Sequence, residues 1–226
     1  MRSGIAIALL AIVALGIGLA LAKVPFGGPK TEVGRHYVDE GVEETGAANI
    51  VTSVVVSYRG FDTLGEVTVL FIAATGLGAV LSTGRKNAAS EKEPASLVLH
   101  TGCRLLFPPI LIFGAYIFVH GHLSPGGGFQ GGAIIASGFL LIYLGCRERR
   151  ISRTASGLAE SLGGLVFVAI GLLGLAFGSH FLSNFLPRGT VNTLFSGGII
   201  PIIYVAVGFK VGSELAGIID NLIEEG

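Results

Sequence analysis

Ionisable side chains inside long apolar runs are the positions in this sequence where chemistry is easiest to place. Arg104 lies seven positions into the run 97–119, and His100 precedes it by four positions on the same helix face. Pro108 and Pro109 remove two backbone donors, which leaves helix carbonyls near Arg104 without their usual partners. A charge at membrane depth is costly unless it is paired or hydrated. We therefore expect protein or water around Arg104. Two roles are open for this residue. It belongs to an ion or proton relay, or it is a structural arginine that pairs with a neighbouring subunit or extends to the interface.

Two further apolar runs carry ionisable groups. Glu66 is the third residue of the run 64–82, where it is either an interfacial carboxylate stabilised by the positive end of a helix or an intramembrane acid that titrates or meets a cation. Lys210 and Glu214 are spaced i,i+4 in the last run, so they share a helix face. We expect them to form an ion pair that holds an apolar helix against its partner, with a place in an ion pathway as the alternative.

The segment 120–132 is the most distinctive feature of the sequence. Its glycines permit positive φ and leave backbone amides uncovered, and Pro125 fixes one turn. His120 and His122 are two positions apart, but no Cys or carboxylate accompanies them, so we predict no metal site. No Lys-Ser/Thr pair follows the glycines and no strand precedes them, which excludes a phosphate-binding loop. We expect an ordered loop that packs tightly against helices.

These groups must be positioned by helices that cross a membrane. Of 226 residues, 51% are hydrophobic and 13% are charged, whereas soluble domains carry about 25% charged residues. The 36 glycines favour close contact between helix backbones. A bilayer core needs about 20 apolar residues per helix, and the runs that approach this length are 4–22, 64–82, 97–119, 131–146, 158–182 and 196–219. We predict an all-α integral membrane protein with about six transmembrane helices plus a short interfacial amphipathic helix.

The amphipathic helix is expected over residues 49–59, which are too few to cross a bilayer. One side of the helix is apolar and consists of Ile50, Val51, Val54, Val55 and Tyr58. The other side carries Thr52, Ser53, Ser57 and Arg59. The β-branched residues at 54–56 leave a strand as the competing interpretation, but the spacing favours a helix that lies at the membrane interface.

A polar connection divides the chain into two modules. Residues 83–96 separate a two-helix module, 1–82, from a four-helix module, 97–226. Lys and Arg are more frequent in the connections that lie inside when the N-terminus is inside, which predicts that both termini are cytoplasmic. The first run ends in Ala20-Leu21-Ala22, which imitates a signal-peptidase site, and we expect this run to be retained as an anchor.

Composition and cysteine spacing exclude several other functions. The net charge is zero and no basic run occurs, so we predict no nucleic-acid partner. Cys103 and Cys146 fit no metal spacing and no disulfide framework, and we expect them to be free thiols in helices. We find no arrangement of a nucleophile, a ligand cluster or a cofactor loop, and therefore predict no catalytic residues and no cofactor.

Two motifs in the chain resemble known families. The segment 120–132, H-G-H-L-S-P-G-G-G-F-Q-G-G, resembles the signature of the MnhB family, the B-type subunits of the Mrp-type multisubunit Na+/H+ antiporters, and the resemblance extends over about 97–222. The segment 54–66, V-V-V-S-Y-R-G-F-D-T-L-G-E, resembles the end of the large A-type antiporter subunits and the small E-type subunit of archaeal membrane-bound hydrogenases. The chain therefore resembles a fusion of the two, similar to subunits of archaeal membrane-bound hydrogenase and sulfane reductase complexes.

The resemblance implies a non-catalytic membrane subunit in the sodium- and proton-translocating part of a large complex. The implied partners are other membrane subunits and the lipid bilayer of the plasma membrane, with Na+ and H+ as the ions carried. The residues that match the two motifs are Arg59, Asp62 and Glu66, and His120, Ser124, Pro125, Phe129 and Gln130. With the residues discussed above, the candidates for an ion pathway are Glu66, Asp62, Arg104, His100, Lys210 and Glu214.

Three alternatives to this function stay open at this point. These alternatives are a subunit of a separate Mrp antiporter, a structural scaffold that carries no ions, and a transporter that acts alone. The last is disfavoured because the sequence has few central polar groups and lacks a pair of matching broken helices.

Overall fold

The computed structural model is all-helical over the residues that it describes, which are 2–24, 27–28, 31–82, 95–146 and 152–225. The helices, in chain order, are α1 Arg2–Ala22, α2 Glu32–Thr45, α3 Ile50–Thr52, the π-helical turn η1 Ser53–Tyr58, α4 Gly60–Ser82, α5 Leu97–Val119, α6 Gly128–Gly145, α7 Arg153–Phe177 and α8 Ile200–Glu225. Six of them, α1 and α4 to α8, are long and apolar enough to cross a membrane. These observations confirm an all-α integral membrane protein.

The chain divides into two compact units, residues 1–36 and 37–226. In the first unit, every side chain of α1 from Gly4 to Ala22 is exposed, although nearly all are apolar. A helix that is apolar on all sides is stable when lipid or other apolar helices surround it. The predicted connection 83–96 coincides with residues outside the described part, except for its last two residues.

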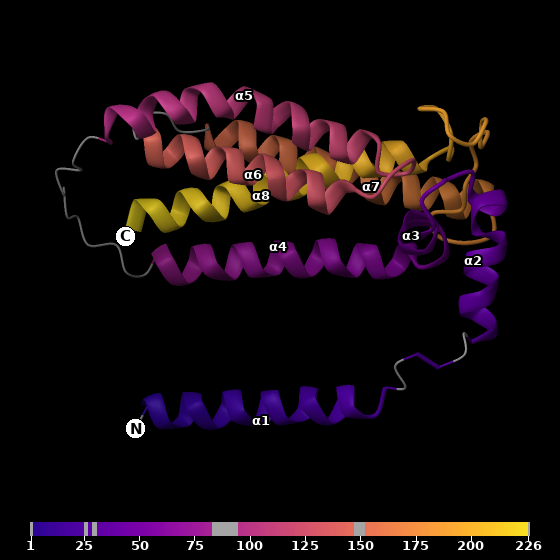
Figure 1. Ribbon diagram of the computed structural model, residues 1–226, viewed down its shortest axis with the longest axis horizontal. Coiled ribbons are helices and arrows are strands. Elements are labelled where there is room, and N and C mark those ends of the chain that lie inside the picture. The colour runs from indigo at the N-terminus through magenta and orange to yellow at the C-terminus, as the bar shows by residue number, and fades with distance from the viewer. Residues whose placement is uncertain (1, 25–26, 29–30, 83–94, 147–151, 226) are drawn as a thin grey trace. The chain divides into compact units, whose positions relative to one another are not determined.

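In the second unit, α8 is the most buried of the spans and packs against α4, α5, α6 and α7. These helices lie side by side, and the connections 46–59, 120–127 and 178–199 gather at one end of them (Figure 1). At the opposite end, α5 begins and α6 and α8 end. We call the first of these ends the loop end and the second the linker end.

Glycines allow α6 and α8 to touch through their backbones. A Cβ added to Gly132 would lie 2.9 Å from the carbonyl oxygen of Gly208 and 2.9 Å from the amide nitrogen of Gly212. One turn earlier, a Cβ on Gly128 would lie 2.7 Å from Cβ of Val207. The high glycine content therefore serves close helix packing, as the composition predicts.

The connection between α7 and α8 differs from the sequence prediction, which extends one span to residue 182 and starts the next at 196. The helix α7 ends at Phe177 because Gly178 is extended, and the chain then folds back so that the amide of Leu182 donates to the carbonyl of Gly171. Leu182 itself is buried with a φ of 61°. Gly197 and Gly198 have φ of 80° and 58°, so α8 begins only at Ile200.

The amphipathic segment is helical, as predicted, but two residues of its polar side are buried, whereas Arg59 of that side is exposed. Thr52 and Ser53 are fully buried, whereas Val51 is 67% exposed. The hydroxyl groups of Thr52 and Ser53 hydrogen-bond within the loop end, which compensates for their burial. Thr52 and Ser53 therefore point inward, because a backbone carbonyl and a hydroxyl group in the interior accept or share their hydrogen bonds.

Candidate functional site

Lys210 and Glu214 on α8 form a buried charged pair in the described part of the second unit. Lys210 Nζ lies 3.0 Å from Glu214 Oε2, and the two side chains are 8% and 1% exposed. This confirms the ion pair predicted from the i,i+4 spacing. Gly163 and Gly164 of α7 make room for the lysine, since a Cβ on Gly163 would lie 3.0 Å from Cβ of Lys210.

The pair contacts a second helix and keeps one acceptor unused. Lys210 Nζ lies 5.3 Å from the centre of the Phe71 ring of α4, which adds a cation–π attraction. Glu214 Oε1 is buried and has no hydrogen-bond partner among the described residues. A buried charge pair needs further hydrogen bonds to offset its desolvation. The pair is therefore incompletely satisfied within this chain.

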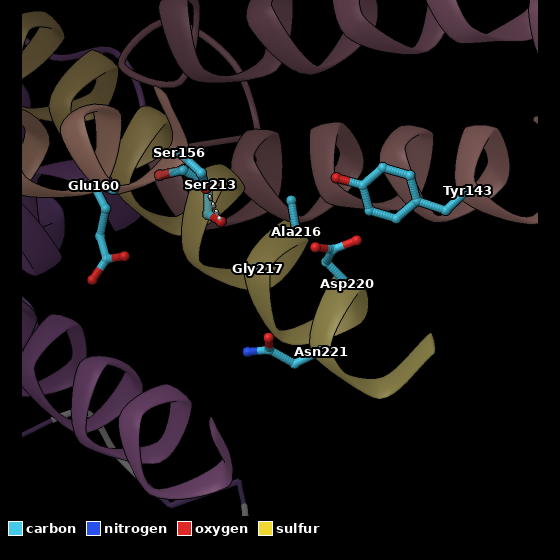
Figure 2. A pocket seen from close by; sticks show the side chains of 9 residues that line it. Tyr143, Ser156, Glu160, Ser213, Ala216, Gly217, Asp220 and Asn221 are labelled. Carbon is cyan, nitrogen blue, oxygen red and sulfur yellow. Dashed lines mark hydrogen bonds between the residues drawn. The ribbon is translucent and has the colours of Figure 1, made fainter. Parts of the chain in front are cut away.

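A cavity of about 280 Å³, lined by both polar and apolar groups, lies further along α8, toward the linker end. Its lining comes from three helices and consists of Tyr143 of α6, Ser156, Gly157 and Glu160 of α7, and Ser213, Ala216, Gly217, Asp220 and Asn221 of α8. Ser156 Oγ donates to the Ser213 carbonyl at 3.1 Å, and the Tyr143 hydroxyl is directed toward Asp220 (Figure 2). Carboxylate, amide and hydroxyl oxygens are the donors that hard cations prefer.

The cavity residues are ones that sequence reasoning misses. Glu160 falls at the third position of the predicted run 158–182, and Asp220 falls one position after the predicted run 196–219. Glu160 and Asp220 lie at the ends of apolar runs, and this position is the sequence signal that could have identified them.

Other predicted residues lie on the outer face of the unit. Glu66 is exposed on α4, while Thr63 and Val67 of the same helix are buried. Arg59 pairs with Asp62 at 2.5 Å, and these two side chains are 62% and 54% exposed. The structure therefore separates Glu66 and Asp62 from the buried pair on α8.

Arg104 and His100 of α5 lie in different surroundings. The helix α5 is continuous over Pro108 and Pro109, and Arg104 lies on its exposed face. No described residue of this chain therefore buries Arg104. His100 is half-buried, and its Nδ1 lies 3.1 Å from the carbonyl oxygen of Gly145 on α6. The two side chains thus have different environments despite their i,i+4 spacing.

The glycine-rich segment is ordered and packed, as predicted. Asn49 Nδ2 donates to the carbonyls of Gly121 and Ser124 at 2.8 and 3.0 Å. Thr52 Oγ1 also donates to Gly121, and the Tyr204 hydroxyl of α8 donates to Thr52 Oγ1, both at 2.8 Å. These bonds join the segment before α4, the loop after α5 and the start of α8 into one network at the loop end.

The motif residues of this loop have several environments. His120 stacks on Tyr116, Ser124 is half-buried, and Phe129 packs against the core, whereas Pro125 and Gln130 are exposed. Gly127 has a φ of 146°, which requires glycine.

His122 is the one buried histidine of this loop. It is 0% exposed, and neither ring nitrogen makes a hydrogen bond of good geometry with a described residue, although backbone groups of Thr193 and Leu194 lie near the ring. Burial lowers the pKa of His122, which favours the neutral form of its ring. No group of three His, Cys, Asp or Glu residues in the described part of the chain has a geometry that could hold a metal ion.

Comparisons with known proteins agree on the two halves of the chain. The family described as a domain related to the MnhB subunit of Na+/H+ antiporters matches residues 98–217. The MbhE family, described as the E subunit of MBH, matches residues 3–96. The A/B subunit of a probable K+/H+ antiporter from Rhizobium meliloti is 29% identical over 78% of this chain, which spans 20% of that relative's length.

Two solved structures have the same fold along nearly the whole chain. A chain of the membrane-bound sulfane sulfur reductase, an archaeal respiratory membrane complex, is 51% identical, with a TM-score of 0.79 and 98% of each chain covered. A chain of the Mrp complex from Dietzia sp. is 29% identical, with a TM-score of 0.75 over 98% of this chain and 26% of the other.

Proposed function

Since this chain belongs to the family of domains related to the MnhB subunit of Na+/H+ antiporters, we propose that it is a non-catalytic membrane subunit of an Mrp-like cation-translocating module. The observation that carries this proposal is the likeness over 98% of both chains to a subunit of an archaeal respiratory membrane complex. That likeness favours an energy-converting redox complex of the sulfane reductase or hydrogenase type as the parent assembly. A subunit of a separate Mrp antiporter is the second candidate, supported by the likeness to the Mrp complex.

The chemistry of the polar interior supports a role with ions. The described part of the chain offers a buried Lys210–Glu214 pair and a cavity with the carboxylates of Glu160 and Asp220. Oxygen groups of this kind exchange Na+ or H+ at membrane depth, where ionisable residues are otherwise rare. Redox chemistry would belong to other chains of the assembly.

The exposed charges on the spans support assembly with other subunits. Glu66 and Arg104 lie on faces that no described residue of this chain covers. Lipid tails would leave both charges unpaired, at a cost of a few kcal/mol each. Neighbouring membrane subunits with complementary polar groups would cover them, whether this chain conducts ions or acts as a scaffold.

The orientation of the chain is also part of the proposal. Both termini are placed on the cytoplasmic side of the plasma membrane, because Lys and Arg are more frequent in the connections on that side. Most of these residues, including Arg85, Lys86 and Arg147, lie outside the described residues. In this orientation the linker end and the cavity face the cytoplasm.

Purification of the tagged chain in mild detergent tests the assembly. Mass spectrometry of the co-purifying chains is expected to identify several other membrane subunits of an Mrp-like or respiratory complex. A monodisperse single chain that transports sodium in liposomes would contradict the proposal.

A carboxylate substitution distinguishes ion conduction from a scaffold role. The double variant Glu160→Gln, Asp220→Asn keeps the size of both side chains and removes their charge. We expect it to assemble normally and to lose sodium-dependent transport in membrane vesicles. The matched control is Asp39→Asn, because Asp39 is an exposed acid outside the spans. Normal transport by the double variant would favour the scaffold.

A further inference from the structure

Two cysteines far apart in sequence meet at the linker end. Cys103 lies in α5 and Cys146 is the residue that follows α6. Their Sγ atoms are 3.3 Å apart, and both thiols are free and buried, at 1% and 6% exposure. The function proposed above makes no use of this pair.

The surrounding contacts hold the two sulfurs against each other. A side chain on Gly145 would collide with Cys103, because its Cβ would lie 2.8 Å from Cβ of Cys103, so the missing side chain lets α6 approach α5 closely here. Cys103 Sγ donates to the carbonyl of His100 at 3.1 Å, and the His100 ring lies 3.6 Å from Cys146 Sγ. The cysteines also form a buried cluster with Ile142 and Tyr143. Neither thiol can turn away without repacking this cluster.

We propose that Cys103 and Cys146 form a thiol–disulfide site, which low-molecular-weight disulfides oxidise to a reversible cross-link between α5 and α6. Cys146 is the more exposed of the two residues and reacts first. Its thiolate attacks one sulfur of the external disulfide, and the other sulfur leaves as a thiolate. Cys103 then attacks the Cys146 sulfur of the mixed disulfide and expels the second thiolate. The protein loses two protons and two electrons, and the external disulfide is reduced to two thiols.

His100 lies beside both cysteines. Its Nδ1 lies 3.1 Å from the carbonyl oxygen of Gly145, and this contact fixes the end of α6 that carries Cys146.

The experiment measures the redox state of the wild-type chain in its native membranes. One portion is treated with oxidised glutathione and another with dithiothreitol, and each is then denatured and alkylated with iodoacetamide. Mass spectrometry is expected to find two alkylated cysteines in the reduced chain. The oxidised chain is expected to carry none and to lack the mass of two hydrogens. Later addition of dithiothreitol should restore both thiols.

The cross-link should also be visible in the stability of the assembled protein. It closes a loop between residues 103 and 146, so the midpoint of thermal denaturation is expected to rise by about 5 to 10 °C on oxidation. In the Cys103→Ser variant, oxidation is expected to cause no such rise of the midpoint. This variant is expected to accumulate the mixed disulfide at Cys146.

A matched control moves one thiol without changing the number of cysteines. Gly102 precedes Cys103, and a Cβ there has no neighbour within 4 Å. The variant Gly102→Cys, Cys103→Ser is therefore expected to form no internal disulfide. Two alkylated cysteines in the oxidised wild-type chain would overturn the proposal. So would a bound zinc or copper ion that protects both thiols in the reduced chain.

Discussion

Two groups of charged side chains lie within the apolar helices of this protein, and their surroundings are opposite. Lys210 and Glu214 are buried, pair with each other and contact the aromatic ring of Phe71. Glu66 and Arg104 lie on exposed faces of α4 and α5. The first group is stabilised mainly by its own chain, whereas the second depends on what the chain contacts in the membrane. We infer that loss of the buried pair acts first on folding, whereas loss of the exposed charges acts first on contacts with other subunits and with ions.

The largest expected effect comes from breaking the buried pair. Lys210→Met leaves the carboxylate of Glu214 buried without its partner, which costs about 3 to 5 kcal/mol. We expect little folded chain in membranes, measured by quantitative immunoblotting, and a lower midpoint of thermal denaturation for what remains. The double variant Lys210→Met, Glu214→Leu should recover most of the folded chain, because it removes both charges. Arg104→Met should leave the amount of chain unchanged and reduce co-purification of other subunits.

The next effect compares a glycine at a tight helix contact with a glycine on an exposed helix face. Gly132→Ala inserts a methyl group between α6 and α8, where the nearest backbone atoms lie 2.9 Å from the new Cβ. Overpacking of this kind typically costs about 1 to 3 kcal/mol. We expect a clearly lower thermal midpoint of the assembled protein in detergent. Gly102→Ala is the matched change on α5, where the Cβ meets nothing within 4 Å, and an equal loss in both variants would contradict the comparison.

Glu66 tests the functional side of the comparison. Glu66→Gln keeps the size of the side chain and removes its charge, so we expect normal assembly with a several-fold loss of sodium-dependent activity in membrane vesicles. Glu66→Asp should be milder because it keeps the carboxylate. Wild-type activity in a normally assembled Glu66→Gln variant would show that this carboxylate does not carry ions.

The smallest effect concerns His122, an ionisable group that is buried without a counter-charge at the loop end. Burial lowers its pKa in the folded chain, so the unfolded chain binds more protons as the pH falls below the ordinary histidine value of about 6.5. Its contribution to stability is therefore present above that pH and decreases below it. We expect the thermal midpoint to fall by a few degrees on acidification from neutral pH. This pH dependence should be weaker in His122→Gln, whereas an identical profile would assign the effect to other groups.

The helices could be predicted from the sequence, while their ends depended on local backbone conformation. The run 97–119 matches α5 at both ends, because polar residues precede it and the glycine-rich segment follows. The run 158–182 extends beyond α7 because Leu182 is apolar, and apolar character does not distinguish a helix from a chain that folds back onto it. The positive φ of Gly197 and Gly198 likewise delays α8, although Ser196 and these glycines fit the predicted run.

The candidate site was predictable only where its residues share a helix. Lys210 and Glu214 meet because i and i+4 positions lie on one face of α8. The cavity residues Tyr143, Glu160 and Asp220 come from three helices, and nothing in their spacing indicates which helices are neighbours. The same reason hides the contact between Cys103 and Cys146, which depends on how α5 crosses α6 at Gly145.

The hydrogen bonds at the loop end connect the parts of the chain that match two separate families. Asn49 and Thr52 belong to the part matched by the MbhE family, and they bond to Gly121, Ser124 and Tyr204 of the part matched by the MnhB-related family. Because both parts are in one polypeptide, each surface meets the other within the same chain, at a higher effective concentration than two separate chains would provide. The two parts therefore assemble in equal numbers at any expression level, and dilution cannot separate them.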